Sequence, residues 1–191
     1  GGGPENEVSL NQLLDALAAS EEGEQVAMLP FPLHFWTTDY DAGAPVLLSV
    51  NGFLAFTSTL SAVRSPFLPS TSLPNGMVAV HARDLENVDP LCVATVGVAP
   101  LRRWVVEWSR AHERSGTTVA TSELTFEAIV TERSDTIDVV YRTMTGALSG
   151  YTGVETPTGT AGVSGCPMVG TSTTYFCAPS AGSSVRFNPS P

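Results

Sequence analysis

The stretch RRWVVEW at residues 102–108 decides the fold, because large apolar side chains alternate in it with charged ones. In an extended chain Trp104 and Trp108 project to one side and Glu107 projects to the other. This period of two is typical of a half-buried antiparallel strand. We therefore expect both tryptophans to lie in the core of a β-sheet protein.

The segments downstream repeat this alternation. Residues 123–131 (ELTFEAIVT) and 136–141 (TIDVVY) place apolar side chains at every second position. The dipeptide Ser134-Asp135 between them predicts a hairpin turn. The side chains expected to point inward are Leu124, Phe126, Ala128, Val130, Ile137, Val139 and Tyr141.

Upstream, residues 46–56 (VLLSVNGFLAF) hold two apolar runs around Asn51-Gly52, which favours a hairpin or a bulge. Further short strands are expected at 77–82, 91–98, 151–155, 173–177 and 184–187. Many short strands separated by turn residues favour a sandwich over an open sheet. The predicted fold class is all-β, an antiparallel and jelly-roll-like β-sandwich, with one domain over residues 26–188.

The N-terminal region has a different pattern. Residues 1–7 (GGGPENE) have no apolar content and are expected to form a flexible tether. Over residues 8–20 leucines recur at helical spacing, and Ser9-x-x-Gln12 matches a capping box, so one short amphipathic helix is predicted. Its apolar stripe would cover the sandwich of its own chain or dock onto a neighbouring subunit.

Composition excludes some classes of function. The chain has 191 residues, a formal net charge of −10 and nine cations, all of them arginine. This balance disfavours binding to nucleic acid, because few cations are present to contact phosphates. The longest apolar runs, such as 46–50, are far shorter than the roughly 20 residues that span a bilayer. No membrane span is expected.

The three cysteines point to an oxidising compartment. Cys166 and Cys177 enclose a short, turn-rich segment, whereas Cys92 lies in an apolar run. We expect the first two to form a disulfide, which would stabilise the fold by about 2–3 kcal/mol, and Cys92 to be buried and free. The alternative is a pair of reduced thiols in a cytosolic protein. The disulfide favours an extracellular or cell-surface location.

Five pieces of sequence, in this order, carry a resemblance to a known family: LPFPLHFW (29–36), SVNGFLAF (49–56), GVAPLRRWVVEW (97–108), LTFEAIVTERSDTIDVVY (124–141) and YTGVETPTG (151–159). Together they resemble a β-sandwich module of large bacterial secreted and surface proteins, related to the NIDO-type domains of nidogen-like extracellular proteins. The resemblance implies a module of matrix or cell-surface assemblies that is not itself an enzyme. Where family members commonly have an aromatic residue followed by two acids, this chain has His81-Ala82-Arg83-Asp84-Leu85 and keeps only Asp84.

No motif in the chain is typical of an active site. His34, His81 and His112 are the only histidines, and none lies in a hydrolase or metalloprotease pattern. We therefore expect no catalytic residues and no cofactor.

The first interpretation is a non-enzymatic structural or adhesive module of an exported protein, a subunit of an extracellular assembly whose partners are other surface proteins or copies of itself. The alternative is a carbohydrate-binding or accessory domain of a larger exported enzyme. Binding of a glycan would need exposed aromatic rings, and Trp36 and Tyr40 are the candidate platform.

The best candidates for a metal site are Asp84, Glu86 and Asp89, since calcium prefers several oxygen ligands at close spacing. Arg83 opposes a cation there and could pair with Asp84 instead. We predict that millimolar calcium leaves the melting temperature unchanged. A large rise in melting temperature that is abolished by Asp84→Asn with Asp89→Asn would contradict this prediction.

Overall fold

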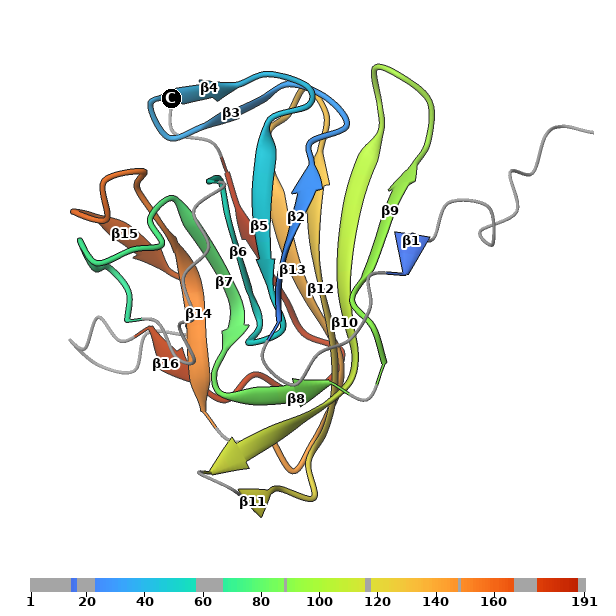
Figure 1. Cartoon of the computed structure of the whole chain (residues 1–191), viewed down its shortest axis with the longest axis vertical. Helices are drawn as coiled ribbons and strands as arrows, with labels where there is room; N and C mark the ends of the chain where they lie inside the picture. Colours follow the sequence, from blue (N-terminus) through green and yellow to red (C-terminus); the bar gives the residue numbers. More distant parts are fainter. Residues whose placement is uncertain are drawn as a thin grey trace, which may run out of the picture.

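A computed structural model describes residues 15–16, 23–57, 67–87, 89–115, 118–147, 149–166 and 175–188. Every regular element in these residues is a β-strand, and every strand pair is antiparallel. Two sheets pack face to face over one main core, and a small hairpin closes one end (Figure 1). The predicted all-β, antiparallel class is confirmed.

The larger sheet has the strand order β1 (Asp15–Ala16), β9 (Cys92–Val96), β10 (Arg103–Ser115), β12 (Glu123–Thr131), β13 (Ile137–Thr145) and β17 (Ser184–Phe187), and both β8 (Leu85–Asn87) and β11 (Thr118–Val119) pair with β10.

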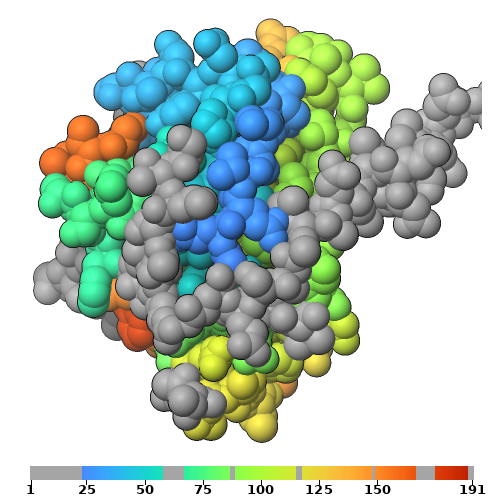
Figure 2. Space-filling model, in the orientation of Figure 1, coloured from blue at the N-terminus to red at the C-terminus, as the bar shows by residue number. Residues whose placement is uncertain are grey.

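The smaller sheet has the order β15 (Gly162–Ser164), β14 (Gly150–Glu155), β7 (Met77–Ala82), β6 (Phe53–Ala55), β5 (Pro45–Ser49) and β2 (Glu24–Met28), and β16 (Phe176–Cys177) pairs with β14. The separate hairpin consists of β3 (Leu33–Phe35) and β4 (Thr38–Tyr40). In the space-filling view this hairpin lies at the top of the molecule, at the end opposite β11 (Figure 2).

The central strand β10 has the face assignment that its alternation predicts. Trp104 and Trp108 are buried, with at most 1% of each side chain exposed. Trp108 pairs in register with Phe126 of β12, and the two rings stack with centroids 5.3 Å apart. The inward residues predicted on β12 and β13 are buried as well. The period-two pattern therefore fixes which face of the larger sheet meets the core.

Both predicted hairpins form. β5 and β6 pair around Asn51-Gly52, and Gly52 has a left-handed φ of +79°. A Cβ atom at this position would lie 2.2 Å from the carbonyl oxygen of His81, so glycine also permits a close approach to β7. β12 and β13 pair across the turn that contains Asp135, which has a φ of +52°.

The N-terminal helix expected over residues 8–20 is not supported. Most of that range, like the tether at residues 1–7, lies outside the described residues. The two residues that are described, Asp15 and Ala16, form β1 and pair with Val93 and Cys92 of β9. The edge of a sheet presents unpaired N–H and C=O groups that can pair with a further strand. The leucine spacing predicts only that this segment makes an apolar contact, and it does not account for pairing with β9. Among the described residues, no helix has the length and apolar character needed to cross a membrane.

Buried hydrogen bonds in the described residues cross from one sheet to the other through the core. The indole Nε1–H of Trp108 donates to the carbonyl oxygen of Ser49 at 2.9 Å. The hydroxyl of Tyr141 donates to the carbonyl oxygen of Val80 at 2.7 Å and lies 2.9 Å from the hydroxyl of Thr152. These bonds satisfy buried polar groups and set how the sheets lie over each other.

We predict that Trp108→Ala lowers the free energy of unfolding by about 3–5 kcal/mol, because it empties a large buried site. Glu107→Gln is the matched control on the opposite face. Burial and a hydrogen bond with Glu127 raise the pKa of Glu107, so a neutral amide there should change stability by only about 0.5 kcal/mol. Denaturant unfolding of both variants gives the comparison, and equal small effects would show that the faces of β10 have been assigned wrongly.

Candidate functional site

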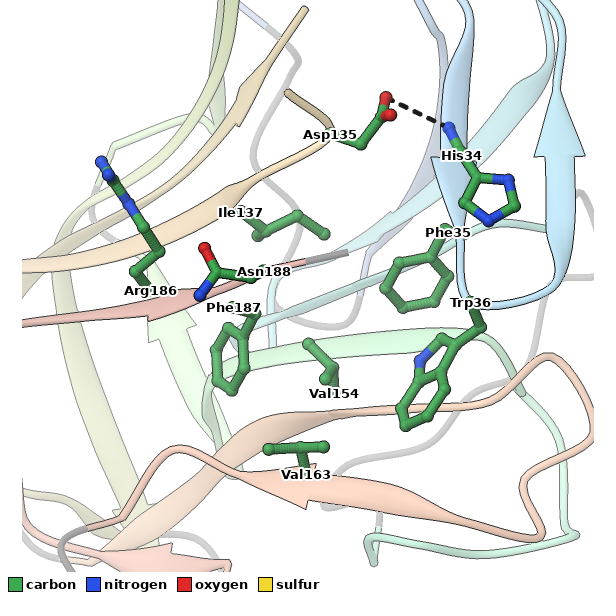
Figure 3. Close-up of a pocket in the computed structure, with 10 residues that line it drawn as sticks. All are labelled: His34, Phe35, Trp36, Asp135, Ile137, Val154, Val163, Arg186, Phe187 and Asn188. Carbon is green, nitrogen blue, oxygen red and sulfur yellow. Dashed lines mark hydrogen bonds between the residues drawn. The ribbon is translucent and has the colours of Figure 1, made fainter. Parts of the chain in front are cut away.

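A pocket of about 300 Å³ opens at the end of the sandwich that the β3–β4 hairpin closes (Figure 3). Its lining comes from both sheets and from the hairpin: His34, Phe35, Trp36, Asp135, Ile137, Val154, Val163, Arg186, Phe187 and Asn188. Segments far apart in the sequence therefore meet at this one place.

The floor of the pocket is apolar. Ile137 on β13 and Phe187 on β17 belong to the larger sheet, and Val154 on β14 belongs to the smaller one. Each is less than 8% exposed, because the strand alternation turns these side chains inward where the sheets face each other. Phe35 of the hairpin completes the floor. An apolar group of a ligand would be desolvated here.

Trp36 forms one wall of the pocket in an unusual backbone conformation. The pairing of Phe35 with Thr38 leaves Trp36 as the first residue of a two-residue loop, and its φ is +57°. Glycine is favoured at such a position, and a left-handed non-glycine residue costs of order 1–3 kcal/mol. In Figure 3 the indole points from the hairpin toward Val154. The strained backbone therefore places a large ring at the pocket.

Polar groups form the rim. The backbone N–H of His34 donates to Oδ1 of Asp135 at 3.2 Å, which ties the β3–β4 hairpin to the β12–β13 turn. Nδ1 of His34 lies 2.6 Å from Oδ1 of Asp39. This hydrogen bond raises the pKa of His34, although burial opposes it. Asp135, like Trp36, has a left-handed backbone, so two residues with positive φ meet at one pocket.

On the other side of the pocket, Arg186 donates from Nε and from its second terminal nitrogen to the two carboxylate oxygens of Asp138, at 2.6 and 2.9 Å. This bidentate pair neutralises the guanidinium charge beside the pocket. Asn188 is exposed and follows directly after β17. The rim can therefore both donate and accept hydrogen bonds.

The pocket lining contains no hydroxyl nucleophile and no thiol. None of the ten lining residues is a serine, threonine or cysteine. Its histidine is engaged with Asp39, and its one carboxylate, Asp135, accepts a backbone N–H. Asp39 contacts Nδ1 of His34, and none of the other nine lining residues is a hydroxyl or thiol nucleophile that this imidazole could activate.

The structure separates the two residues of the predicted glycan platform. Trp36 lines the pocket, whereas Tyr40 packs its ring against Phe56 with centroids 5.1 Å apart. Burial raises the pKa of the Tyr40 hydroxyl. Trp36 lies just before β4 and Tyr40 is the last residue of that strand, so their proximity in sequence indicated a shared surface, but only Trp36 lines the pocket.

The three acidic metal candidates are not gathered into one site. Arg110 donates from Nε to Asp89 at 2.6 Å, and this hydrogen bond lowers the pKa of Asp89. Glu86 lies 3.7 Å from the guanidinium of Arg114. The carbonyl oxygen of Asp84 accepts a hydrogen bond from the backbone N–H of Arg114 at 2.9 Å. Within the described ranges, no group of three or more histidine, cysteine or acidic side chains could hold a metal ion.

Arg83 turns instead toward the carbonyl oxygen of Ser149 and lies 3.9 Å from Glu113. Glu113 and His81 form a fully buried pair, with Nε2 of His81 3.1 Å from Oε1 of Glu113. Gly150 makes room for the imidazole, because a Cβ atom there would lie 2.8 Å from the ring. No local sequence pattern indicated this pair. The imidazole of His112 instead contacts the carbonyl oxygen of Ser122.

The disulfide between Cys166 and Cys177 is present and joins the segment after β15 to β16. Cys92 is free, but the expectation that it is buried is wrong, because it is only partly buried. It is the first residue of β9 and pairs with the two-residue β1 near the edge of the larger sheet. Burial, with Glu107 and Asp89 nearby, raises the pKa of its thiol.

Comparison with known proteins gives one match. A family model described as NIDO related matches residues 7–189, nearly the whole chain. No curated protein and no solved structure matches the chain.

A buried carboxyl on β14 yields a prediction about pH. Glu155 is fully buried beside Val154, and its Oε2 accepts the backbone N–H of Ser70 at 3.0 Å. Burial raises the pKa of Glu155 from an ordinary 4.5 to about 7. The folded state therefore holds this proton more tightly than the unfolded state, so stability should fall as pH rises from about 4.5 to about 7 and then level off.

We predict that Glu155→Gln removes this slope, which is about 3 kcal/mol across the window. Glu132→Gln is the matched control with the opposite sign. Hydrogen bonds from Arg102 lower the pKa of Glu132 to about 2, so its contribution should be lost only as pH falls below about 4.5. Unfolding curves of both variants between pH 3 and 8 test this, and an unchanged slope in Glu155→Gln would contradict it.

Proposed function

The chain belongs to the NIDO-related family, and from that premise we propose that it is a non-enzymatic module of an exported protein, with an adhesive or structural role, which holds its partner in the pocket beside Trp36. The partner is another surface protein or a second copy of the module. The extracellular or cell-surface location, the absence of catalysis and the lack of a cofactor are all parts of this proposal.

Export is supported by the disulfide and by the family. Disulfides persist mainly in oxidising compartments, and the Cys166–Cys177 bond connects two short elements at the edge of the smaller sheet. Two-residue strands such as β16 gain little stability from their own pairing. The disulfide therefore stabilises this edge of the sheet, and such a bond persists in the oxidising environment outside the cell.

The observation that carries the proposal is the left-handed backbone of Trp36 at the wall of an apolar pocket. Strain of this kind persists where surrounding structure imposes it, and it concentrates at binding and catalytic sites. A glycine would form the same loop without strain. The ring packs edge-on against Phe35 and lines the pocket, so its role lies in these contacts rather than in the turn.

Carbohydrate binding is the second candidate, as a binding or accessory domain of a larger exported enzyme. One observation favours it. The indole of Trp36 lies at the same pocket as the carboxylate of Asp135 and the amide of Asn188. A sugar can place its C–H face on an aromatic ring while its hydroxyls bond to such polar groups. Because Tyr40 lies outside the pocket, a sugar would rest on one ring only.

We predict that Trp36→Gly weakens partner binding about tenfold while changing the free energy of unfolding by only about 1 kcal/mol, because relief of strain offsets the lost packing of the ring. Binding is measured as concentration-dependent self-association by sedimentation velocity and as retention on a glycan array. Self-association that depends on Trp36 supports the adhesive role, and glycan retention that depends on it supports the second candidate.

Two results would contradict the proposal. If Trp36→Gly destabilised the protein as strongly as Trp108→Ala, the ring would be a core residue rather than a recognition residue. If the variant self-associated or retained glycans as the wild type does, the pocket would not be the place where the partner binds.

A further inference from the structure

The pocket lies beside a sheet edge that none of the described strands covers. β17 is the last strand of the larger sheet, and within the described part of the chain it pairs only with β13. Arg186 and Phe187 at its end line the pocket, as does Asn188 directly after it (Figure 3). A ligand in the pocket is therefore within reach of the edge of the sheet.

The hydrogen-bond pattern identifies which backbone groups point outward from that edge. The N–H of Tyr141 donates to the carbonyl oxygen of Ser183, and bonded pairs in an antiparallel ladder recur at every second residue. Val185 and Phe187 are therefore the β17 residues whose N–H and C=O groups face β13. The N–H and C=O groups of Ser184 and Arg186 point the other way, toward the open edge.

The side chains at this edge lead into the pocket. Phe187 is buried and forms part of the pocket floor, while Val163 on β15, across from it, is 49% exposed. In a strand added beside β17, the residue next to Phe187 would turn its side chain to the same face. That side chain would enter the pocket between Val163 and the indole of Trp36.

The charges around the opening of the pocket indicate which residue type should lie next to the inserted side chain of the ligand. Asp39 has a side chain that is 90% exposed, and Asp135 adds a second carboxylate at the rim. Arg133 on the same turn offsets one of them, and Arg186 is already neutralised by Asp138. His34 also pairs with Asp39, so the negative charge that attracts a cation to this face comes mainly from the whole chain, which carries −10. A ligand with a basic flank is complementary to it.

We propose that the β17 edge and the Trp36 pocket together bind an extended segment of a partner protein, which pairs with Ser184 and Arg186 as an added strand and inserts one apolar side chain, flanked by a basic residue, into the pocket. This inference rests on the proposed function, because it assumes that the pocket holds the partner. Main-chain pairing supplies affinity in this mode, and the pocket supplies specificity. A glycan would engage the pocket and leave the edge of β17 unpaired.

The test uses peptides selected from a random 12-residue phage-displayed library on the immobilised wild-type domain and then synthesised. Their affinity is measured for the wild type, Trp36→Gly, Arg186→Pro and Arg186→Ala. Proline at 186 removes the N–H at the open edge, where edge strands tolerate it. Alanine is the matched control, since it removes the ion pair with Asp138 but keeps the N–H.

We expect the selected peptides to share an apolar residue with a basic neighbour. Trp36→Gly and Arg186→Pro should each weaken binding about tenfold, and Arg186→Ala less than about threefold. As a measurement that needs no variant, amide exchange of Ser184 and Arg186 in the wild type should slow when the peptide binds.

Each other outcome contradicts the inference, and the outcomes distinguish a failure of strand addition from a failure of the proposed function. If Trp36→Gly loses binding while Arg186→Pro matches Arg186→Ala and the amides stay unprotected, strand addition is wrong and the pocket remains the binding site. If no peptide is selected, or only glycans bind, the partner is not an extended segment. If selected peptides bind all variants equally, both this inference and the proposed function fail.

Discussion

The hydrogen bond from the indole of Trp108 to the carbonyl oxygen of Ser49 is the contact on which the rest of the structure depends. It links the middle of the larger sheet to the last residue of β5, directly before the Asn51-Gly52 turn. An apolar core alone is non-directional and would allow the sheets to slide over one another. This buried bond, with that from Tyr141 to Val80, fixes their relative position. Because the floor of the pocket takes residues from both sheets, the pocket depends on that position too.

Much of the fold could be predicted from local patterns. Strand alternation identified the inward faces of β10, β12 and β13, and turn dipeptides located both hairpins. The pattern around residues 8–20 did not predict β1, because whether a chain pairs at a sheet edge depends on the partner strand β9, about 75 residues away. Cys92 was misjudged for the same reason. Its apolar neighbours are local, but its exposure depends on its place in the sheet order.

Less of the pocket than of the fold could be predicted from the sequence. Trp36 could be singled out, but its position between Val154, Val163 and Phe187 depends on strand pairs that are distant in sequence. Tyr40 had the same local signal and packs against Phe56 instead. The left-handed backbone of Trp36 could not be predicted from the sequence either, since tryptophan rarely adopts that conformation. His81 and Glu113 lie on strands of opposite sheets, so their contact could not be predicted from local patterns. The one related sequence feature is Gly150, whose small size leaves room for the imidazole.

The disulfide has a consequence for how the molecule would respond to mechanical force. Cys166 and Cys177 are 11 positions apart in sequence and 5.7 Å apart between Cα atoms. If tension unravelled the domain, this crosslink would withhold about 30–35 Å of extended chain from the contour length. The force would pass through the disulfide bond from the segment after β15 to β16, and the residues between the two cysteines would carry none of it. In a surface assembly under shear, the bond would therefore limit how far the edge beside β14 can be drawn out, and it would keep β16 next to β14 when refolding begins.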